Sequence, residues 1–156
     1  MDTKVQLEQL LIKWEVGNTP LRTICTVGRE LGLDKLVVGI GHDVTEEDAL
    51  EYGDKILLAR VAQLFEQDVE KAMAEAVRIL PTIAEYPLEV QLVLPAMCFQ
   101  MGEHGVRSFK KFLHHLGNKN YYEASQEMLH SQWARETPHR ARAMAQLIAG
   151  ARRSRQ

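Results

Sequence analysis

The sequence predicts a predominantly helical α+β protein with two lobes. Apolar residues recur at three- and four-residue steps from Val61 to Leu80, the spacing of a long amphipathic helix, and Pro81 stops the pattern. Residues 21–42 differ, because four glycines divide short β-branched stretches, which favours a small sheet. The chain after Pro87 carries several further helical patterns, so we expect helices to dominate the fold.

Each element follows from a local signal. Leucines and Trp14 at helical spacing predict a first helix at residues 3–15, which a glycine and Pro20 end. The run Thr45-Glu46-Glu47-Asp48 is typical of a helix start, where the macrodipole favours acidic side chains. The helices expected after the long one lie at about 88–101, 106–116, 120–132 and 137–150.

A helix as long as the one that follows Val61 is able to link two lobes. We therefore expect a single domain over residues 1–156. Its small sheet lobe is expected at about 16–56. Its helical lobe is expected at about 57–156, with the N-terminal helix added.

Composition excludes several classes of protein. With 156 residues, of which 46% are apolar and 26% charged, the chain is large enough to bury a core. Its two cysteines cannot form a disulfide framework or a four-cysteine zinc site. No apolar run is long enough to span a membrane, and the N-terminus lacks the basic start and apolar stretch of a secretory signal, so we expect synthesis in a cytoplasm. The histidines show no metal-ligand spacing and no phosphate loop is present, so neither a metal nor a cofactor is expected.

The net charge of −2 conceals an uneven distribution. Residues 1–100 hold 9 Lys and Arg against 17 Asp and Glu, whereas residues 101–156 hold 10 against 4. A basic half attracts polyanions, and both nucleic acid and an anionic cell-wall polymer fit that description. The alternative is a globule whose two halves neutralise one another. No recognition-helix motif and no basic–aromatic interleaving is present, so nucleic acid is not an expected partner.

Three polar residues occupy unusual positions in the helical patterns, and a fourth follows a predicted strand. Asp68 lies on or beside the apolar stripe of the long helix, and a buried carboxylate needs a partner, for which His42 is a candidate. Arg140 lies at the margin of the last helix's apolar face, where its guanidinium either reaches water or pairs with a carboxylate. Glu15 ends the first helix, where an acid opposes the macrodipole unless a cation such as Arg140 is near. The alternative for each residue is an ordinary solvated side chain.

Several blocks of sequence resemble the phage-type lysozymes, the T-even phage endolysin family. The two most specific are Phe99-Gln100-Met101-Gly102-Glu103 and Trp133-Ala134-Arg135-Glu136-Thr137-Pro138-His139-Arg140-Ala141. Two more, upstream, are Val38-Gly39-Ile40-Gly41-His42 and Leu64-Phe65-Glu66-Gln67-Asp68-Val69. The resemblance covers most of the chain and is dense after residue 60.

The resemblance implies a two-lobe lysozyme-like fold with a long connecting helix. It also implies hydrolysis, with inversion, of the β-1,4 bond between N-acetylmuramic acid and N-acetylglucosamine in peptidoglycan. By position, Glu15 matches the general acid, and Arg140 matches the arginine that pairs with it. His42 and Asp68 match a structural ion pair, and Phe99 matches a residue that touches the sugar chain.

The sequence also departs from the family's pattern. No aspartate falls where the second acid is expected, and the nearest acids are Glu30, which fits slightly better, and Asp34. Val37 stands at the position of a threonine that precedes the Gly-x-Gly-His block. Ala96 replaces an asparagine, and two polar positions on the helical side of the cleft become Phe112 and Glu127.

Two functions follow as hypotheses. The first is a monomeric muramidase that causes bacterial lysis, with Glu15 as acid and Glu30 as base. Such an enzyme would stay in the cytoplasm of the producing bacterial host until release and would act on the glycan strands of the cell wall. The second is a lysozyme-fold protein that has lost catalysis and serves as a glycan-binding or interaction module, which the departures at Val37 and Ala96 favour.

Overall fold

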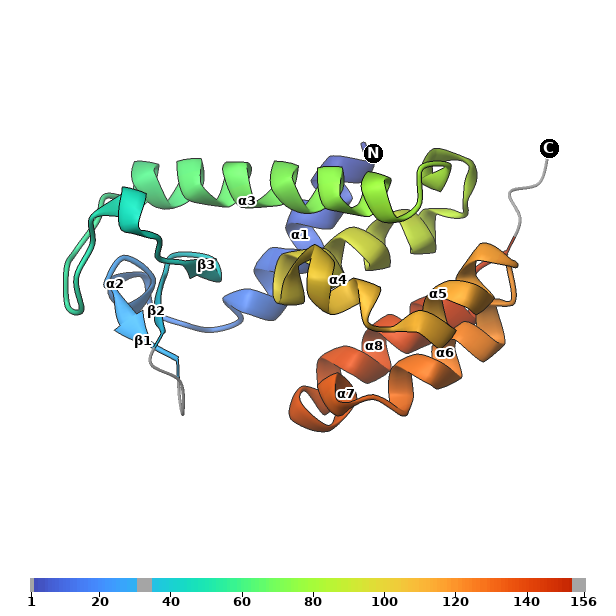
Figure 1. The fold of residues 1–156 in the computed structure, drawn as a ribbon. Coiled ribbons are helices and arrows are strands. Elements are labelled where there is room, and N and C mark those ends of the chain that lie inside the picture. The colour runs from blue at the N-terminus through green and yellow to red at the C-terminus, as the bar shows by residue number, and fades with distance from the viewer. Residues whose placement is uncertain (1, 31–34, 153–156) are drawn as a thin grey trace. The chain divides into compact units, whose positions relative to one another are not determined.

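The computed structural model describes residues 2–30 and 35–152. These residues form a mainly helical structure with one small sheet (Figure 1), so the predicted helical α+β class is confirmed. The elements in chain order are α1 (Thr3–Glu15), α2 (Leu21–Ile24), β1 (Gly28–Arg29), β2 (Leu36–Val38), β3 (His42–Asp43), η1 (Glu46–Asp48), α3 (Leu58–Ile79), η2 (Ile83–Glu85), α4 (Leu88–Arg107), α5 (Lys110–Gly117), α6 (Tyr121–Leu129), α7 (Gln132–Glu136) and α8 (Pro138–Ala149).

The contacts divide the described residues into two compact units. The sheet unit spans Glu8–Lys71, and the helical unit takes the residues up to Leu7 together with those from Ala72 onward. The helix α3 therefore begins in the sheet unit and ends in the helical unit.

The sheet unit is built on three short antiparallel strands in the order β1-β2-β3. Gly28 pairs with Val37, and Val38 pairs with His42. The glycines around β2 allow this tight path, because Gly39 has a φ of +67° and a Cβ there would lie 3.2 Å from Val61. A small core underlies the sheet, formed by the buried residues Val27, Val38 and Leu64 with Leu36, Val44, Leu50 and Ile56 packed against them.

Two short helices in the sheet unit differ from the sequence-based expectation. A single helical turn, α2, occupies the start of the stretch expected to be strand, because the N–H groups of Thr23 and Ile24 bond the carbonyl of Pro20. The acidic run after Thr45 forms only a 3₁₀ turn and ends at Ala49, whose φ of 53° is left-handed. Both segments are too short to leave a periodic signal.

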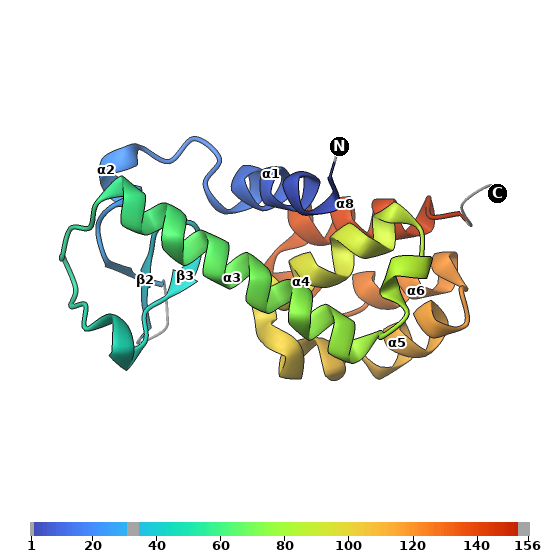
Figure 2. The same ribbon diagram turned by 90° about the horizontal axis from the view of Figure 1, so that it is seen from above.

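The helical unit contains α4 to α8. Within it α6 packs against both α5 and α8, as Figure 2 shows. Apolar side chains at helical spacing close this core, among them Met97, Phe112, Leu116, Met144 and Ile148. Two expected helices have different ends: the one at 106–116 begins only at Lys110, as α5, and the one at 120–132 stops at Leu129, as α6. The helix α7 follows α6 as a separate helix whose N-terminus Ser131 caps.

The helix α4 is broken at Gly102. This residue has φ 75° and ψ 166°, a conformation that is essentially restricted to glycine. The sequence-based end of this helix, at about residue 101, falls at the break, and a second short segment runs on to Arg107. The side of Gly102 that a Cβ would occupy is open, since no heavy atom lies within 4 Å. Backbone conformation is therefore what requires glycine here.

We expect Gly102→Ala to lower the free energy of unfolding by about 1–3 kcal/mol, the cost of a side chain in this backbone region. Urea unfolding measures the change. Gly117→Ala is the matched control, because Gly117 ends α5 without a positive φ and also has free space around it. Equal losses in the two variants would show that the conformation of Gly102 is not strained for alanine.

Candidate functional site

The sheet unit holds a buried histidine between two carboxylates. His42, which is 7% exposed, lies in β3, and its Nδ1 is 2.7 Å from Asp68 Oδ2 of α3. Its Nε2 is 2.8 Å from Asp48 Oδ2 of η1. The same Asp48 oxygen accepts a hydrogen bond from the backbone N–H of Thr45, and Arg60 Nη2 lies 3.8 Å from the other oxygen. This cluster joins the sheet, the 3₁₀ turn and the long helix.

The structure thus brings His42 and Asp68 together, and it adds Asp48, which the sequence analysis did not assign to the pair. The hydrogen bond to Asp68, with further support from Asp48, raises the pKa of His42 to about 9 even though burial opposes the charged form. The pKa of Asp48 lies below its usual range: burial acts against that shift, and the bonds from Thr45 and His42 outweigh it. The imidazolium form of His42 is therefore the one present at neutral pH.

We expect the stability of the sheet unit to fall as pH rises toward 9. Because the folded pKa of His42 is raised from an ordinary value of 6.5 to about 9, its stabilising effect is complete below pH 6.5 and is lost as pH rises through 9. The loss is on the order of 3 kcal/mol. Urea unfolding from pH 5 to 10 measures it, and NMR titration of the His42 ring protons gives the pKa directly.

The Asp68→Asn variant supplies the comparison for this pH series. It removes the carboxylate that contributes most to the raised pKa of His42, so its stability should change less between pH 6.5 and 9. A His42 resonance that titrates near 6.5 in the unmodified protein would contradict the prediction.

Glu30, the predicted base, directly follows the last residue of β1 and is exposed. Its backbone N–H donates to the carbonyl of Lys35, which closes the connection between β1 and β2. Lys35 Nζ lies 3.6 Å from the Glu30 carboxylate and 3.0 Å from that of Asp43. The alternative base, Asp34, lies outside the described residues. Glu30 therefore stands at the sheet unit's surface with a lysine beside it.

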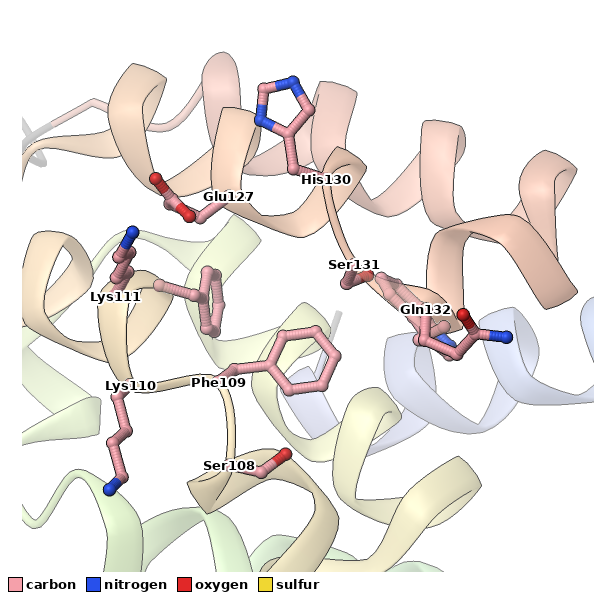
Figure 3. A pocket seen from close by; sticks show the side chains of 10 residues that line it. Ser108, Phe109, Lys110, Lys111, Glu127, His130, Ser131 and Gln132 are labelled. Carbon is pink, nitrogen blue, oxygen red and sulfur yellow. The ribbon is translucent and has the colours of Figure 1, made fainter.

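The helical unit carries an open groove of about 460 Å³, seen in Figure 3. Its apolar wall consists of edge-to-face rings, with Phe109 6.1 Å from Trp133 and 6.4 Å from Phe112 between ring centroids. Polar side chains surround these rings: Lys110 and Lys111 on the α5 side, and Glu127, His130, Ser131 and Gln132 on the α6–α7 side, with Ser108 completing the lining. An apolar wall with charged groups of both signs suits a ligand that is partly apolar and partly charged.

No family model matches the chain. The chain is 29% identical over 113 residues, 70% of its length, to the probable T4-type lysozyme 1 of Dictyostelium discoideum. The resemblance to the T4-type lysozymes is confirmed. A second relative is peptidoglycan hydrolase gp36 of Pseudomonas phage phiKMV, 28% identical over 116 residues and 74% of this chain.

These matches to a T4-type lysozyme and a peptidoglycan hydrolase cover different shares of the relatives. The chain spans 65% of the Dictyostelium lysozyme and 13% of the phage hydrolase. The matched regions, each more than two thirds of this chain, are long enough to include elements of both units.

The resemblance to the T4-type lysozymes also assigns roles to Glu15, Arg140 and Phe99, and these residues are distributed over the two units. Glu15 is the last residue of α1 and is partly buried, in the sheet unit. Arg140 lies in the first turn of α8 and Phe99 lies in α4, three residues before the break, both partly buried in the helical unit. The pairing of Glu15 with Arg140 and the contact of Phe99 with sugar stay predictions.

Two further findings concern metal binding and membrane-spanning helices. Across residues 2–30 and 35–152, no cluster of three or more His, Cys, Asp or Glu is placed to hold a metal ion. In the same part of the chain, no helix has the length and apolar character needed to cross a membrane.

Proposed function

We propose that this chain is a lysozyme-like peptidoglycan hydrolase, and more specifically a muramidase that cleaves the β-1,4 bond between N-acetylmuramic acid and N-acetylglucosamine. The observation that carries the proposal is the pair of relatives, a lysozyme and a peptidoglycan hydrolase from very different sources, each matched over 70% or more of the chain. Lysis of bacteria is the expected consequence of such cleavage.

In this proposal Glu15 donates a proton to the leaving oxygen, and Glu30 activates a water on the opposite face of the sugar. Inversion of the anomeric centre requires about 6.5–9.5 Å between two such carboxyl groups, which leaves room for the water. Arg140 orients Glu15, and Phe99 contacts the glycan. The cluster of His42 with Asp48 and Asp68 holds β3 against α3 and so supports the sheet that carries Glu30.

The groove of the helical unit supports the same proposal. Phe112 and Glu127 line it, and the resemblance assigns both positions to the helical side of the substrate cleft. Aromatic rings such as Phe109 and Trp133 offer faces and edges against which a sugar or a peptide side chain packs. We infer that the groove takes part of the peptidoglycan strand.

The proposal is tested with the purified chain on outer-membrane-permeabilised Gram-negative cells, by loss of turbidity between pH 4 and 8. Mass spectrometry of borohydride-reduced products identifies the bond: a muramidase gives fragments that end in reduced muramic acid. Fragments that end in reduced glucosamine would replace the proposed specificity with that of a glucosaminidase. Absence of any product from folded protein would remove the hydrolase proposal.

A second candidate is a non-catalytic glycan-binding or interaction module. The observations that favour it are Val37 and Ala96 at positions where the resembled family has polar residues, and the ion pair that engages Glu30. Cosedimentation with insoluble peptidoglycan without release of soluble fragments would favour this candidate. Soluble products that disappear in Glu15→Gln would exclude it.

We further propose that the active form is a monomer without a cofactor. It would be made in the cytoplasm of the producing bacterial host and would reach peptidoglycan only on release. Light scattering of the purified chain tests whether it is a monomer, and activity in the presence of a chelator tests whether it works without a metal cofactor. A dimer, or loss of activity with the chelator, would contradict the corresponding statement.

A further inference from the structure

Glu75 is a buried acid of α3 that the proposed chemistry does not use. Only 8% of its surface is exposed, and its Oε2 accepts a hydrogen bond of 3.1 Å from the backbone N–H of Glu103. Removing a carboxylate from water is costly, and an apolar side chain of similar volume is often no less stabilising. The carboxylate at this position therefore calls for a role that an apolar side chain cannot fill.

The hydrogen bond from Glu103 falls at the break in α4. Because Gly102 leaves helical geometry, Glu103 begins a new helical segment, whose first N–H groups have no acceptor within the segment. The carboxylate of Glu75 supplies that acceptor, and its negative charge is favourable at the start of a helix. Glu75 thus acts on the segment after the break as a capping side chain does, from a different helix.

Glu103 is held through its side chain as well. Arg78 of α3 donates from Nε to Glu103 Oε1 at 2.8 Å, and Arg107 donates from Nε to Oε2 at 2.9 Å. Glu75 and Arg78 are three residues apart on α3, so they lie on the same side of that helix. Together they fix both the backbone and the side chain of Glu103, and with them the direction of the segment after the break.

Residues on both sides of the break in α4 contact or line the groove. Before it, Gln100 Oε1 accepts a hydrogen bond of 2.9 Å from Trp133 Nε1, which fixes the indole in the groove wall. After it, the segment ends at Arg107, and the next five residues, 108–112, line the groove. The angle at Gly102 therefore sets where Phe109 lies relative to Trp133, the two rings that stand edge to face in the wall.

We propose that Glu75 is a positioning residue for the substrate groove of the helical unit. It does not touch the ligand. Its hydrogen bond to Glu103 holds the break in α4 at the angle that brings Phe109 against Trp133. This inference rests on the proposed function only in that the ligand of the groove is taken to be part of peptidoglycan.

The test compares Glu75→Met, which keeps the length of the side chain and removes the acceptor, with Glu75→Gln, which keeps an acceptor. Glu85→Ala, at an exposed acid of η2, is the control. We expect Glu75→Met to fold and to raise KM for soluble peptidoglycan fragments about tenfold, equal to 1.4 kcal/mol of binding, with kcat little changed. Glu75→Gln should restore most of the affinity, and Glu85→Ala should match the unmodified chain.

Two readouts that need no substrate separate this inference from the proposed hydrolase activity. Hydrogen exchange at the Glu103 amide should speed up in Glu75→Met, and the Trp133 indole proton resonance should shift. If both change while KM stays the same, the groove does not depend on Glu75 and the inference fails. If the unmodified chain neither cleaves nor binds peptidoglycan, the proposed function fails, and an unshifted Trp133 resonance in Glu75→Met would then refute the positioning role by itself.

Discussion

Replacement of Glu15 by glutamine is expected to lower the rate of peptidoglycan hydrolysis by about 10²–10⁴-fold, the range typical for loss of a positioned general acid. Glutamine has nearly the shape of glutamate but carries no transferable proton, so the leaving oxygen would depart as an unprotonated alkoxide. The change should appear in kcat rather than in KM, since substrate contacts stay in place. Initial rates on soluble peptidoglycan fragments measure it.

The matched control is Glu8→Gln in the same helix, two turns before Glu15. Circular dichroism should show that both variants keep the helical content of the unmodified chain. We expect Glu8→Gln to retain its activity. A Glu15→Gln variant that cleaves peptidoglycan at the unmodified rate would exclude Glu15 as the acid and would leave the hydrolase proposal without its central residue.

Much of the fold was accessible from the sequence because long amphipathic helices carry a strong periodic signal. The first helix and the long helix were expected within a few residues of where they lie. The turn α2 and the separate helix α7 left no such signal, since four or five residues span little more than one turn. Gly102 could be read as a helix end, but the segment that continues after it could not, because its first N–H bonds an acceptor on α3, which is distant in the sequence.

The candidate site, like the fold, could be predicted from the sequence only in part. His42 and Asp68 were brought together by a simple argument, that a carboxylate on an apolar stripe needs a partner. Asp48 escaped that argument because it lies on a short turn, and only the path of the chain returns it to His42. The same reasoning applied to Glu75, one residue before the buried Ala76, would have marked a second buried acid.

The position of the second acid was the hardest to predict, because a hairpin's register decides which side chains share a face. Arg29 pairs with Leu36, so Glu30 follows the last paired residue of β1, and its backbone N–H donates to the carbonyl of Lys35. The spacing of the acids favours Glu30 over Asp34 only slightly. Variants at the two positions make that distinction.

Glu30→Gln is expected to reduce hydrolysis by about 10²–10⁴-fold, because water without a general base is a poor nucleophile at the anomeric carbon. Asp34→Asn should keep a rate close to that of the unmodified chain. Azide, a small anionic nucleophile that needs no deprotonation, should restore part of the activity of Glu30→Gln and give a glycosyl azide of inverted configuration. Such rescue would not occur in Glu15→Gln, which still activates water but cannot protonate the leaving group.

The pair of variants also decides between the two proposed functions. If Asp34→Asn is inactive and Glu30→Gln is active, the base is Asp34 and the muramidase proposal stands with one residue exchanged. If neither change affects a measurable rate, an inverting mechanism with either acid is excluded. If the unmodified chain binds peptidoglycan but cleaves no bond, the muramidase proposal fails and the glycan-binding module remains, with Glu30 held by its ion pair to Lys35.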